Sequence, residues 1–319
     1  MKISMYRLGR RLNGLRYIVD ILARVRGGEL YIFGKGIYMS CCGQNGCSET
    51  ACGVSKNLFD IFVDPKTGHK LIAVDQAGGC CGSRAALIND QTGTGYPIVS
   101  GIACFLKEGD ISGRNARYQG LYDGFAFWYD LAQWFGEKFW VNKTDDLLVQ
   151  RIKDLNITSG ERVLEISVGT GEQLKKMPQG IEFYGVDISM GMLERCLRKR
   201  RKCNFPITLA WAKAEELPFA DNSFDVILHV GGINFFTDKA KALSEMARVA
   251  KPGARFVIAD ETEKLAKEGE TTMFAKQFFV DRDEEIVPPV DLLPDTLEDV
   301  KLEHRTDGSL YIITAHKRG

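Results

Sequence analysis

The stretch from Val163 to Gly171, which reads V-L-E-I-S-V-G-T-G, constrains the fold of this chain more than any other. Its first residues form a short apolar run, and the two glycines stand directly before helix-compatible residues 172–176. A buried strand that turns sharply into a helix has this pattern, because Gly169 and Gly171 leave room where backbone approaches a ligand. The N-terminus of the helix supplies free N–H groups at the same place.

A second predicted strand, residues 183–186, ends in Asp187. An acid at the tip of the second strand of a βαβ unit can accept both ribose hydroxyls of a nucleoside. The dinucleotide fingerprint G-x-G-x-x-G requires a third glycine, and Leu174 stands in that position. The pattern therefore argues against a bound pyrophosphate, although a lone glycine turn is equally consistent with an ordinary buried strand.

Charge and hydropathy exclude several classes of protein. The 319 residues suffice for two domains, or for one large domain with an appendage. Lys plus Arg and Asp plus Glu both number 42, so no overall field attracts nucleic acid, and the acidic stretch 281–299 would repel phosphates. No apolar run approaches the roughly 20 residues of a membrane span. We expect a cytoplasmic protein without a nucleic-acid partner.

Residues 1–26 carry seven basic residues and one acid, with apolar residues at helical spacing. This pattern predicts a basic amphipathic helix. We favour a helix that docks on its own protein, because such patterns are common in soluble proteins. Peripheral contact with an anionic membrane surface and an organelle transit peptide are the alternatives.

Seven of the nine cysteines lie in the first third of the chain. Six of them form two clusters whose thiols could hold zinc, an iron–sulfur cluster or a soft metalloid. No C-x-x-C pair is present, and adjacent cysteines chelate one ion poorly, so we predict free thiols and no metal site. The residues of the alternative metal site are Cys41, Cys42, Cys47, Cys52, Cys80 and Cys81.

From residue 145 onward, strands and helices alternate, which predicts a parallel sheet with helices on both faces. The K-P-G sequence at 251–253 is a helix stop signal, and T-D-G at 306–308 predicts the turn of a closing hairpin. The predicted strands are 163–168, 183–187, 207–211, 224–230, 254–260, 300–305 and 310–316. The predicted helices are 145–155, 190–202 and 239–250.

Four motifs in this order resemble the class I S-adenosylmethionine (SAM) methyltransferases of the ubiquinone/menaquinone-biosynthesis type, the type 11 group. They cover about residues 118–262. The first is the glycine stretch itself, in the order E-x-x-x-G-x-G. The others are D-I-S-M-G-M-L at 187–193, A-E-E-L-P-F-A-D-N-S-F-D at 214–225 and E-M-A-R-V-A-K-P-G at 245–253.

The resemblance implies SAM as the cofactor and a Rossmann-like, seven-stranded α/β domain. In the family, the acid after strand two takes the ribose hydroxyls, and Ile188 and Met192 would lie against the adenine. Glu165 would organise the glycine loop near the amino group of SAM, and Ser167 stands where glycine or alanine is usual. The implied cofactor-binding residues are Glu165, Ser167, Gly169, Gly171, Asp187, Ile188, Met192, Ala214, Glu215 and His229.

Residues 58–106 resemble the small zinc-ribbon module that serves as a methyltransferase activator, through Y-P-I at 96–98 and G-I at 101–102. Asp64, Thr67, Asn89 and Thr92 stand where the family has its four zinc cysteines, so this ribbon should bind no zinc there. A small β-unit without its metal needs a neighbouring domain to complete a core. We therefore expect it to pack tightly on the catalytic domain.

Aromatic residues are dense between 114 and 146, and the family uses this segment as part of a lid. Most of these rings belong in the core, and Tyr122 and Tyr129 are the two that we assign to the substrate pocket. A second lid segment is expected within 264–296, including Phe278, and Asn234 borders the same pocket. The loop 232–235 reads G-I-N-F and lacks the arginine of the family's G-L-R-N, which argues against a quinone or a polyprenylated phenol.

These observations predict three parts: a basic helix with a cysteine-rich segment over 1–57, a degenerate zinc-ribbon-like domain over 58–112, and a SAM-dependent methyltransferase domain over 113–319. The predicted reaction is methyl transfer to an aromatic or lipophilic small molecule. The alternatives are a thiol or metalloid methyltransferase that uses the N-terminal cysteines, and a non-catalytic SAM-binding scaffold. His229 and Tyr122 are the candidate catalytic residues, and His229 is the candidate for a general base. We favour packing for His229 because the sequence shows no partner acid.

Overall fold

The computed structural model describes residues 31–33, 36–38, 59–76, 84–107, 110–111, 146–199, 203–270 and 285–319. Several predictions lie outside these residues: the basic helix of 1–26, the six clustered cysteines, and the pocket residues Tyr122, Tyr129 and Phe278. No described helix is long and apolar enough to cross a membrane.

The chain divides into two units, Met1–Gly53 and Val54–Gly319. In the first unit, strands β1 (Tyr31–Phe33) and β2 (Gly36–Tyr38) pair antiparallel. The described residues of the second unit form one 11-stranded sheet, in the order β12-β13-β11-β10-β7-β8-β9-β6-β5-β4-β3.

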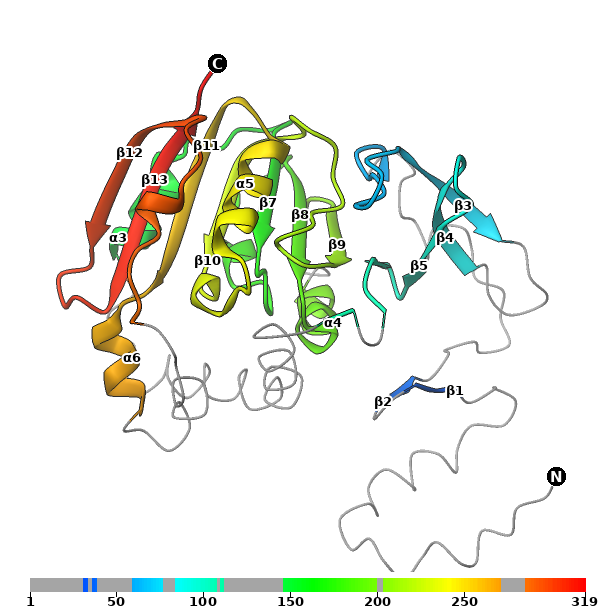
Figure 1. Ribbon diagram of the computed structural model, residues 1–319, viewed down its shortest axis with the longest axis horizontal. Coiled ribbons are helices and arrows are strands. Elements are labelled where there is room, and N and C mark those ends of the chain that lie inside the picture. Colours follow the sequence, from blue (N-terminus) through cyan, green and yellow to red (C-terminus); the bar gives the residue numbers. More distant parts are fainter. Residues whose placement is uncertain are drawn as a thin grey trace, which may run out of the picture. The chain divides into compact units, whose positions relative to one another are not determined.

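The α/β part supplies seven of these strands (Figure 1). Six of the seven run in the same direction, and β13 lies antiparallel between β11 and β12. The predicted alternation of strands and helices is therefore confirmed. The seven strands are β7 (Arg162–Ile166), β8 (Glu182–Asp187), β9 (Ile207–Trp211), β10 (Phe224–Val230), β11 (Ala250–Glu261), β12 (Leu297–His304) and β13 (Leu310–Lys317).

Helices cover both faces of this sheet, as the sequence predicted (Figure 1). On one face, α5 buries Leu243 and Met246 fully, and each such side chain contributes about 1.5–3 kcal/mol. On the other face, α3 buries Ile152 and α4 buries Leu193 and Cys196. The α-helices are α3 (Asp146–Asp154), α4 (Met190–Lys199), α5 (Lys239–Val249) and α6 (Glu263–Glu270), and the 3₁₀ helices are η3 (Gln173–Lys176), η5 (Ile233–Phe235) and η6 (Val290–Leu292).

Local signals explain where α5 begins and ends. Its N-cap, Asp238, has extended backbone and accepts a hydrogen bond from the Lys241 N–H. The helix stops at Val249, directly before the predicted stop signal, where Pro252 lacks an N–H and Gly253 adopts a φ of 77°. The following strand, β11, begins at Ala250 and is thus longer than the predicted 254–260.

Four strands between residues 71 and 104 extend the sheet of the α/β part. They are β3 (Leu71–Gln76), β4 (Arg84–Asn89), β5 (Gly95–Val99) and β6 (Ile102–Cys104). Strand β6 runs parallel to β9 with Ala103 opposite Ala210, and the Phe105 N–H donates to the Trp211 carbonyl at 3.0 Å. The expected packing of this small β-unit on the catalytic domain is therefore present, and its kinship to zinc ribbons stays a prediction.

An aromatic cluster joins the small β-unit to the catalytic sheet. The Phe62 ring is fully buried, stacks on Phe105 at a centroid distance of 5.6 Å, and lies 4.8 Å from Phe219. Phe219 in turn contacts Tyr184 of β8 edge to face at 5.9 Å. Aromatic pairs of this kind add about 0.5–1.5 kcal/mol beyond the area that they bury. The two parts thus share one core.

Hydrogen bonds join three of the residues that stand at the positions of the family's zinc cysteines, Asp64, Thr67 and Asn89. The Asp64 carboxylate is buried and accepts from the Asn89 amide, the Tyr96 hydroxyl and the Lys66 N–H, each at 2.9 Å. The Asn89 amide also donates to the Thr67 hydroxyl at 3.1 Å. Burial acts to raise the pKa of Asp64, but its hydrogen bonds together outweigh burial and hold the pKa below the ordinary value, so the ionised carboxylate is stable in the interior.

Two similar turns contribute to this cluster. The turn after Asp64 returns the Gly68 N–H to the Asp64 carbonyl at 2.8 Å. In the turn after Asn89, the Gly93 N–H donates to the Asn89 carbonyl at 2.8 Å. The Asn89 side-chain Oδ1 accepts from the N–H groups of Gln91 and Thr92. Short polar side chains that accept nearby N–H groups stabilise such turns.

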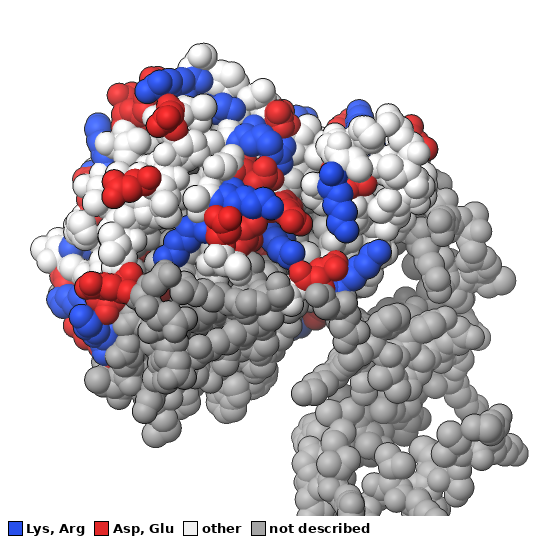
Figure 2. Space-filling view, viewed as in Figure 1, with Lys and Arg blue, Asp and Glu red and all other residues white. Residues whose placement is uncertain are grey.

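Charges of both signs are interspersed on the face shown in Figure 2. Among the ion pairs of the described residues, Arg248 of α5 pairs with Glu245 at 2.6 Å and with Asp221 at 2.7 Å. Its guanidinium also donates to the carbonyls of Leu217 and Phe219. The E-x-x-R motif of the sequence therefore fastens the loop after β9 to α5.

Candidate active site

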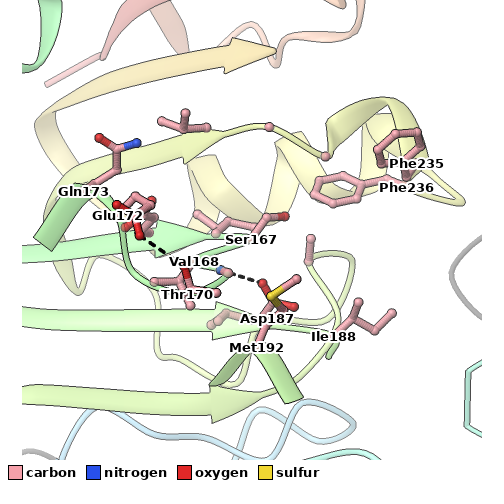
Figure 3. Close-up of a pocket in the computed structure, with 18 of the residues that line it drawn as sticks. Ser167, Val168, Thr170, Glu172, Gln173, Asp187, Ile188, Met192, Phe235 and Phe236 are labelled. Atoms are coloured by element: carbon pink, nitrogen blue, oxygen red, sulfur yellow. Dashed lines mark hydrogen bonds between the residues drawn. The ribbon is translucent and has the colours of Figure 1, made fainter. Parts of the chain in front are cut away.

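A cavity of about 390 Å³ opens at the carboxyl ends of β7, β8, β10 and β11. This is the edge at which open α/β sheets bind ligands. Its wall comes from the glycine turn after β7, the loop after β8, the loop after β9 and the loop after β10 (Figure 3). The sequence-predicted residues in the wall are Glu165, Ser167, Gly169, Asp187, Ile188, Met192, Ala214 and Glu215.

The glycine turn has left-handed backbone at Ser167, Gly169 and Gly171, whose φ angles are 57°, 52° and 77°. Gly169 lies in the cavity wall and Gly171 does not. A Cβ added at Gly171 would lie 2.7 Å from both Cys196 Sγ and Leu174 Cδ1. Close packing on α4, rather than approach to the cavity, therefore requires this second glycine.

The helix predicted after the glycine turn is a single 3₁₀ turn, η3, in place of an α-helix. Glu172 precedes it and is held by Lys199 of α4 and by Lys175 at 3.1 Å. Burial opposes the charged form of Glu172, but the hydrogen bonds from Lys199 and Lys175 keep its pKa below the ordinary value. Glu172 thus stays ionised in the cavity wall.

Asp187 lies at the carboxyl end of β8 and is 9 % exposed. Its two carboxylate oxygens accept from the N–H groups of Gly169 and Ser189, both at 2.8 Å. The first of these bonds joins β8 to the glycine turn across the cavity floor, as Figure 3 shows. The carboxylate is therefore fixed in one orientation beside the glycine backbone.

The loop that follows Asp187 and the first turn of α4 present apolar side chains to the same cavity. Ile188 and the buried Met192 lie in its wall, next to Asp187 in Figure 3. The indole N–H of Trp211 donates to the Ile188 carbonyl at 2.8 Å, and the Met192 N–H donates to Ser189 Oγ at 3.2 Å. This wall has the apolar character that a planar heteroaromatic ring requires.

The loop after β9 contributes Ala214 and Glu215. The Glu215 carboxylate is 6 % exposed, and its Oε1 accepts from the N–H groups of Thr237 and Asp238 at 3.1 and 3.4 Å. This side chain therefore ties the loop after β9 to the N-terminus of α5, where a negative charge is favourable.

Glu165 of β7 is 2 % exposed and also lies in the cavity wall. Its Oε2 has no hydrogen-bond partner among the described residues. Burial raises the pKa of Glu165 well above its ordinary value; Lys176 opposes this rise, and Asp187 and Glu172 add to it. A cationic group of a ligand would satisfy this carboxyl, because a buried charge needs a partner.

His229 is fully buried, and it is not part of the cavity wall. Its Nδ1 lies 3.1 Å from the Ile166 carbonyl, so Nδ1 carries the proton and Nε2 can only accept. Burial lowers the pKa of His229, although Asp260 and the Ile166 carbonyl favour its charged form. The ring lies 5.3 Å from that of Phe236 and supports the wall from behind.

Asn234, predicted in the substrate pocket, also lies outside the wall. Its N–H donates to Asp260 at 3.2 Å, and its amide donates to the Glu261 carbonyl at 3.3 Å. These bonds hold the loop after β10 against the end of β11. Phe235 and Phe236, the next residues of that loop, do line the cavity and lie at the end away from Gln173 in Figure 3.

Sequence reasoning missed several residues of the wall. The Gly231-Gly232 pair, both with left-handed backbone, and the Phe-Phe pair after it were available signals of a tight loop with apolar side chains. Val168 and Thr170 lie inside the glycine stretch 163–171, so their place in the sequence was a further signal. The missed wall residues include Val168, Thr170, Glu172, Gln173, Gly231, Gly232, Phe235, Phe236 and Glu261.

The seven-strand order and this cavity at the carboxyl ends match the class I methyltransferase fold. Residues 164–258 match a protein family described as "Methyltransferase domain". The chain is 38 % identical over 102 residues to demethylmenaquinone methyltransferase of Renibacterium salmoninarum, which is 32 % of this chain and 41 % of the relative.

A second relative is the ubiquinone/menaquinone biosynthesis C-methyltransferase UbiE of Francisella philomiragia, 34 % identical over 157 residues, or 46 % of this chain and 60 % of the relative. The chain thus spans about half the length of these curated relatives. Among solved structures, a SAM-dependent methyltransferase of Thermotoga maritima superposes with a TM-score of 0.47 at 22 % identity, and the match covers 63 % of this chain and 99 % of that chain.

Proposed function

We propose that this chain is a SAM-dependent methyltransferase that transfers a methyl group to an aromatic or lipophilic small molecule. The observation that carries the proposal is Asp187, a fixed carboxylate at the tip of β8 whose Oδ2 accepts the Gly169 N–H at the edge of the cavity. An acid at this place in an α/β sheet is suited to ribose hydroxyls. The match of residues 164–258 to methyltransferase domains supports the same function.

The cavity residues fit each part of SAM by their chemistry. Asp187 would hold the ribose, and the apolar wall of Ile188 and Met192 would hold the adenine. The buried carboxyl of Glu165, whose Oε2 has no partner, suits the ammonium of the methionine part. Gly169 leaves its backbone open, since nothing lies closer than 3.9 Å to a Cβ added there.

SAM supplies an activated methyl group when it is bound, so the chain has to align the acceptor and exclude water. The loop after β10 contributes to both tasks, because Phe235 and Phe236 close one end of the cavity. A general base is needed only for an acceptor that starts protonated. The fully buried His229 is poorly suited to that role because its Nδ1 is engaged with a backbone carbonyl.

The acceptor class rests on the aromatic wall and on the relatives. Two relatives are named for quinone biosynthesis, which makes a naphthoquinol the first acceptor to test. The loop 232–235 lacks the arginine of the quinone-ring enzymes, so another aromatic or lipophilic molecule is the acceptor that we favour. The segment 58–112 is proposed as a built-in β-unit that completes the edge of the catalytic sheet.

Calorimetric titration with SAM and with S-adenosylhomocysteine tests the proposal. We expect both to bind, and Asp187→Ala to weaken binding at least tenfold, because each lost charge-assisted hydrogen bond costs about 1.5–3 kcal/mol. Asp295→Ala, an exposed acid, is the matched control. Labelled SAM incubated with a metabolite extract then identifies the acceptor. Absence of SAM binding by the folded wild-type protein would exclude the enzyme.

A further inference from the structure

Glu165 differs from the other acids of the cavity wall. Asp187 and Glu172 have both carboxylate oxygens occupied by backbone N–H groups or by lysines, and Oε1 of Glu215 accepts two backbone N–H groups. Glu165 is equally buried, at 2 % exposure, but its Oε2 has no hydrogen-bond partner among the described residues. One oxygen of this carboxyl therefore lies in the wall without a hydrogen-bond donor that would stabilise a negative charge on it.

The charged and titratable groups that act on Glu165 come from β8, from η3 and the residue before it, and from α4. They are Asp187 at the end of β8, Glu172 before η3, Lys176 in η3 and Cys196 in α4. Two of these are acids, and the Lys176 ammonium already donates to the Gln173 side chain at 2.8 Å. The Cys196 thiol is itself buried, and burial together with Glu165 raises its pKa, so it supplies no charge.

This surrounding favours a protonated carboxyl in the free protein. Burial raises the pKa of Glu165 well above its ordinary value, and the neighbouring acids act in the same direction against Lys176. A cation held within about 4–6 Å reverses the preference, because it stabilises the ionised form. The ligand proposed above carries two cationic groups, an ammonium and a sulfonium.

We propose that Glu165 is a proton-release site, at which binding of the cationic cofactor converts a neutral carboxylic acid into a carboxylate paired with the ligand. The inference rests on the proposed function, since it takes SAM as the ligand. The balance is simple: the O–H bond of the Glu165 carboxyl breaks, the proton passes to the solvent, and the negative charge stays on the carboxylate. No oxidant, reductant or second reactant takes part.

The sign of the pH dependence follows from this balance. The free protein holds one proton more than the complex, so a rise in pH favours the complex. Affinity should increase by about tenfold per pH unit below the pKa of the free carboxyl and become constant above it. A carboxylate that was already ionised in the free protein would give no such slope near neutral pH.

Calorimetry of SAM binding in two buffers of equal pH and different ionisation enthalpy measures the number of protons released. We expect SAM binding to release protons from the wild-type protein at a pH below the pKa of the free carboxyl, and Glu165→Gln to release none at the same pH. Glu298→Gln, an exposed acid on β12, should release the same number as the wild-type protein. Proton release that persists in Glu165→Gln would overturn the proposal, because the proton would then come from the ligand or another side chain.

S-adenosylhomocysteine keeps the ammonium and lacks the sulfonium charge. Release with both ligands supports the ammonium as the partner of Glu165, and release with SAM alone supports the sulfonium. If Glu165→Gln binds SAM too weakly for calorimetry, infrared difference spectra of the wild-type protein show whether a carboxyl group loses its proton when SAM binds. Loss of a protonated-carboxyl band on addition of SAM supports the proposal, and an unchanged carboxyl region overturns it. SAM binding without proton release removes only this inference, whereas absence of SAM binding removes the proposed function.

Discussion

Replacement of Asp64 by alanine tests whether the buried hydrogen-bond cluster holds the small β-unit together. The substitution removes the acceptor of three hydrogen bonds, each of 2.9 Å, from Asn89, Tyr96 and the Lys66 N–H. Asn89 keeps Thr67 as a partner at 3.1 Å, whereas the Tyr96 hydroxyl loses its acceptor. A buried donor without a partner costs about 1–3 kcal/mol, so we expect the free energy of unfolding to fall by about 2–4 kcal/mol.

Urea unfolding followed by fluorescence and by circular dichroism measures this loss. Because the small β-unit shares its core with the catalytic sheet, both signals should shift together. Tyr96→Phe removes the donor and leaves the carboxylate, so a double-mutant cycle with Asp64→Ala should show non-additivity of about 1 kcal/mol. Thr92→Ala, at an exposed side chain of the same unit, is the control. A loss below about 0.5 kcal/mol for Asp64→Ala would refute the reasoning.

Three further outcomes are expected. The hydrogen bonds from Asn89, Lys66 and Tyr96, which outweigh burial, lower the pKa of Asp64, so its contribution is present above about pH 4 and is lost as the pH falls below that value; unfolding of the wild type and of Asp64→Asn should converge in acid. Gly171→Ala should destabilise by about 2–3 kcal/mol in thermal unfolding and Gly169→Ala by about 1, since only the first adds a clash to the strained φ. Because burial lowers the pKa of His229, the protein should lose stability as the pH falls below about 6.5. The same urea assay should show a smaller loss of stability below this pH for His229→Gln.

Local sequence patterns were sufficient for the catalytic sheet. The short apolar runs, the stop signal at 251–253 and the turn at 306–308 define strands and helices whose ends differ by a few residues at most from the structure. The Gly308 N–H, for example, closes the hairpin turn on the Arg305 carbonyl at 2.7 Å. Such elements are specified by periodicity and turn chemistry within a few residues of sequence.

The pairing of β6 with β9 could not be predicted. The run Ile102–Cys104 has three residues, too few to show a period, and its partner lies more than 100 residues away. The sequence indicated that the small β-unit needs a neighbour, but local pattern carries no register between distant strands. Aromatic residues of the small β-unit, such as Phe62 and Phe105, are consistent with a core shared with the α/β sheet, but they do not identify the strand that pairs with β6.

Motifs in the sequence predicted the candidate site. The residues whose observed role differs from the predicted one differ because of contacts made in the tertiary structure. Glu215 was expected to bind the cofactor; it lies in the cavity wall, and its Oε1 accepts two N–H groups at the start of α5. Gly171 was expected to give a ligand room, and the structure shows that Cys196 of α4 occupies the space. In both cases the neighbour that decides the role comes from an element distant in sequence. Motif position identifies such residues without stating which neighbour they serve.

The continuous sheet has a consequence for dividing this chain. A fragment that starts after residue 112 would leave the backbone of β9 with unpaired N–H and C=O groups along one side, and would uncover Phe219. Such a bare strand invites other copies to pair with it. The smallest fragment that keeps the fold intact therefore begins before Phe59. In the whole chain, the small β-unit pairs with β9 and so prevents this strand from pairing with other molecules.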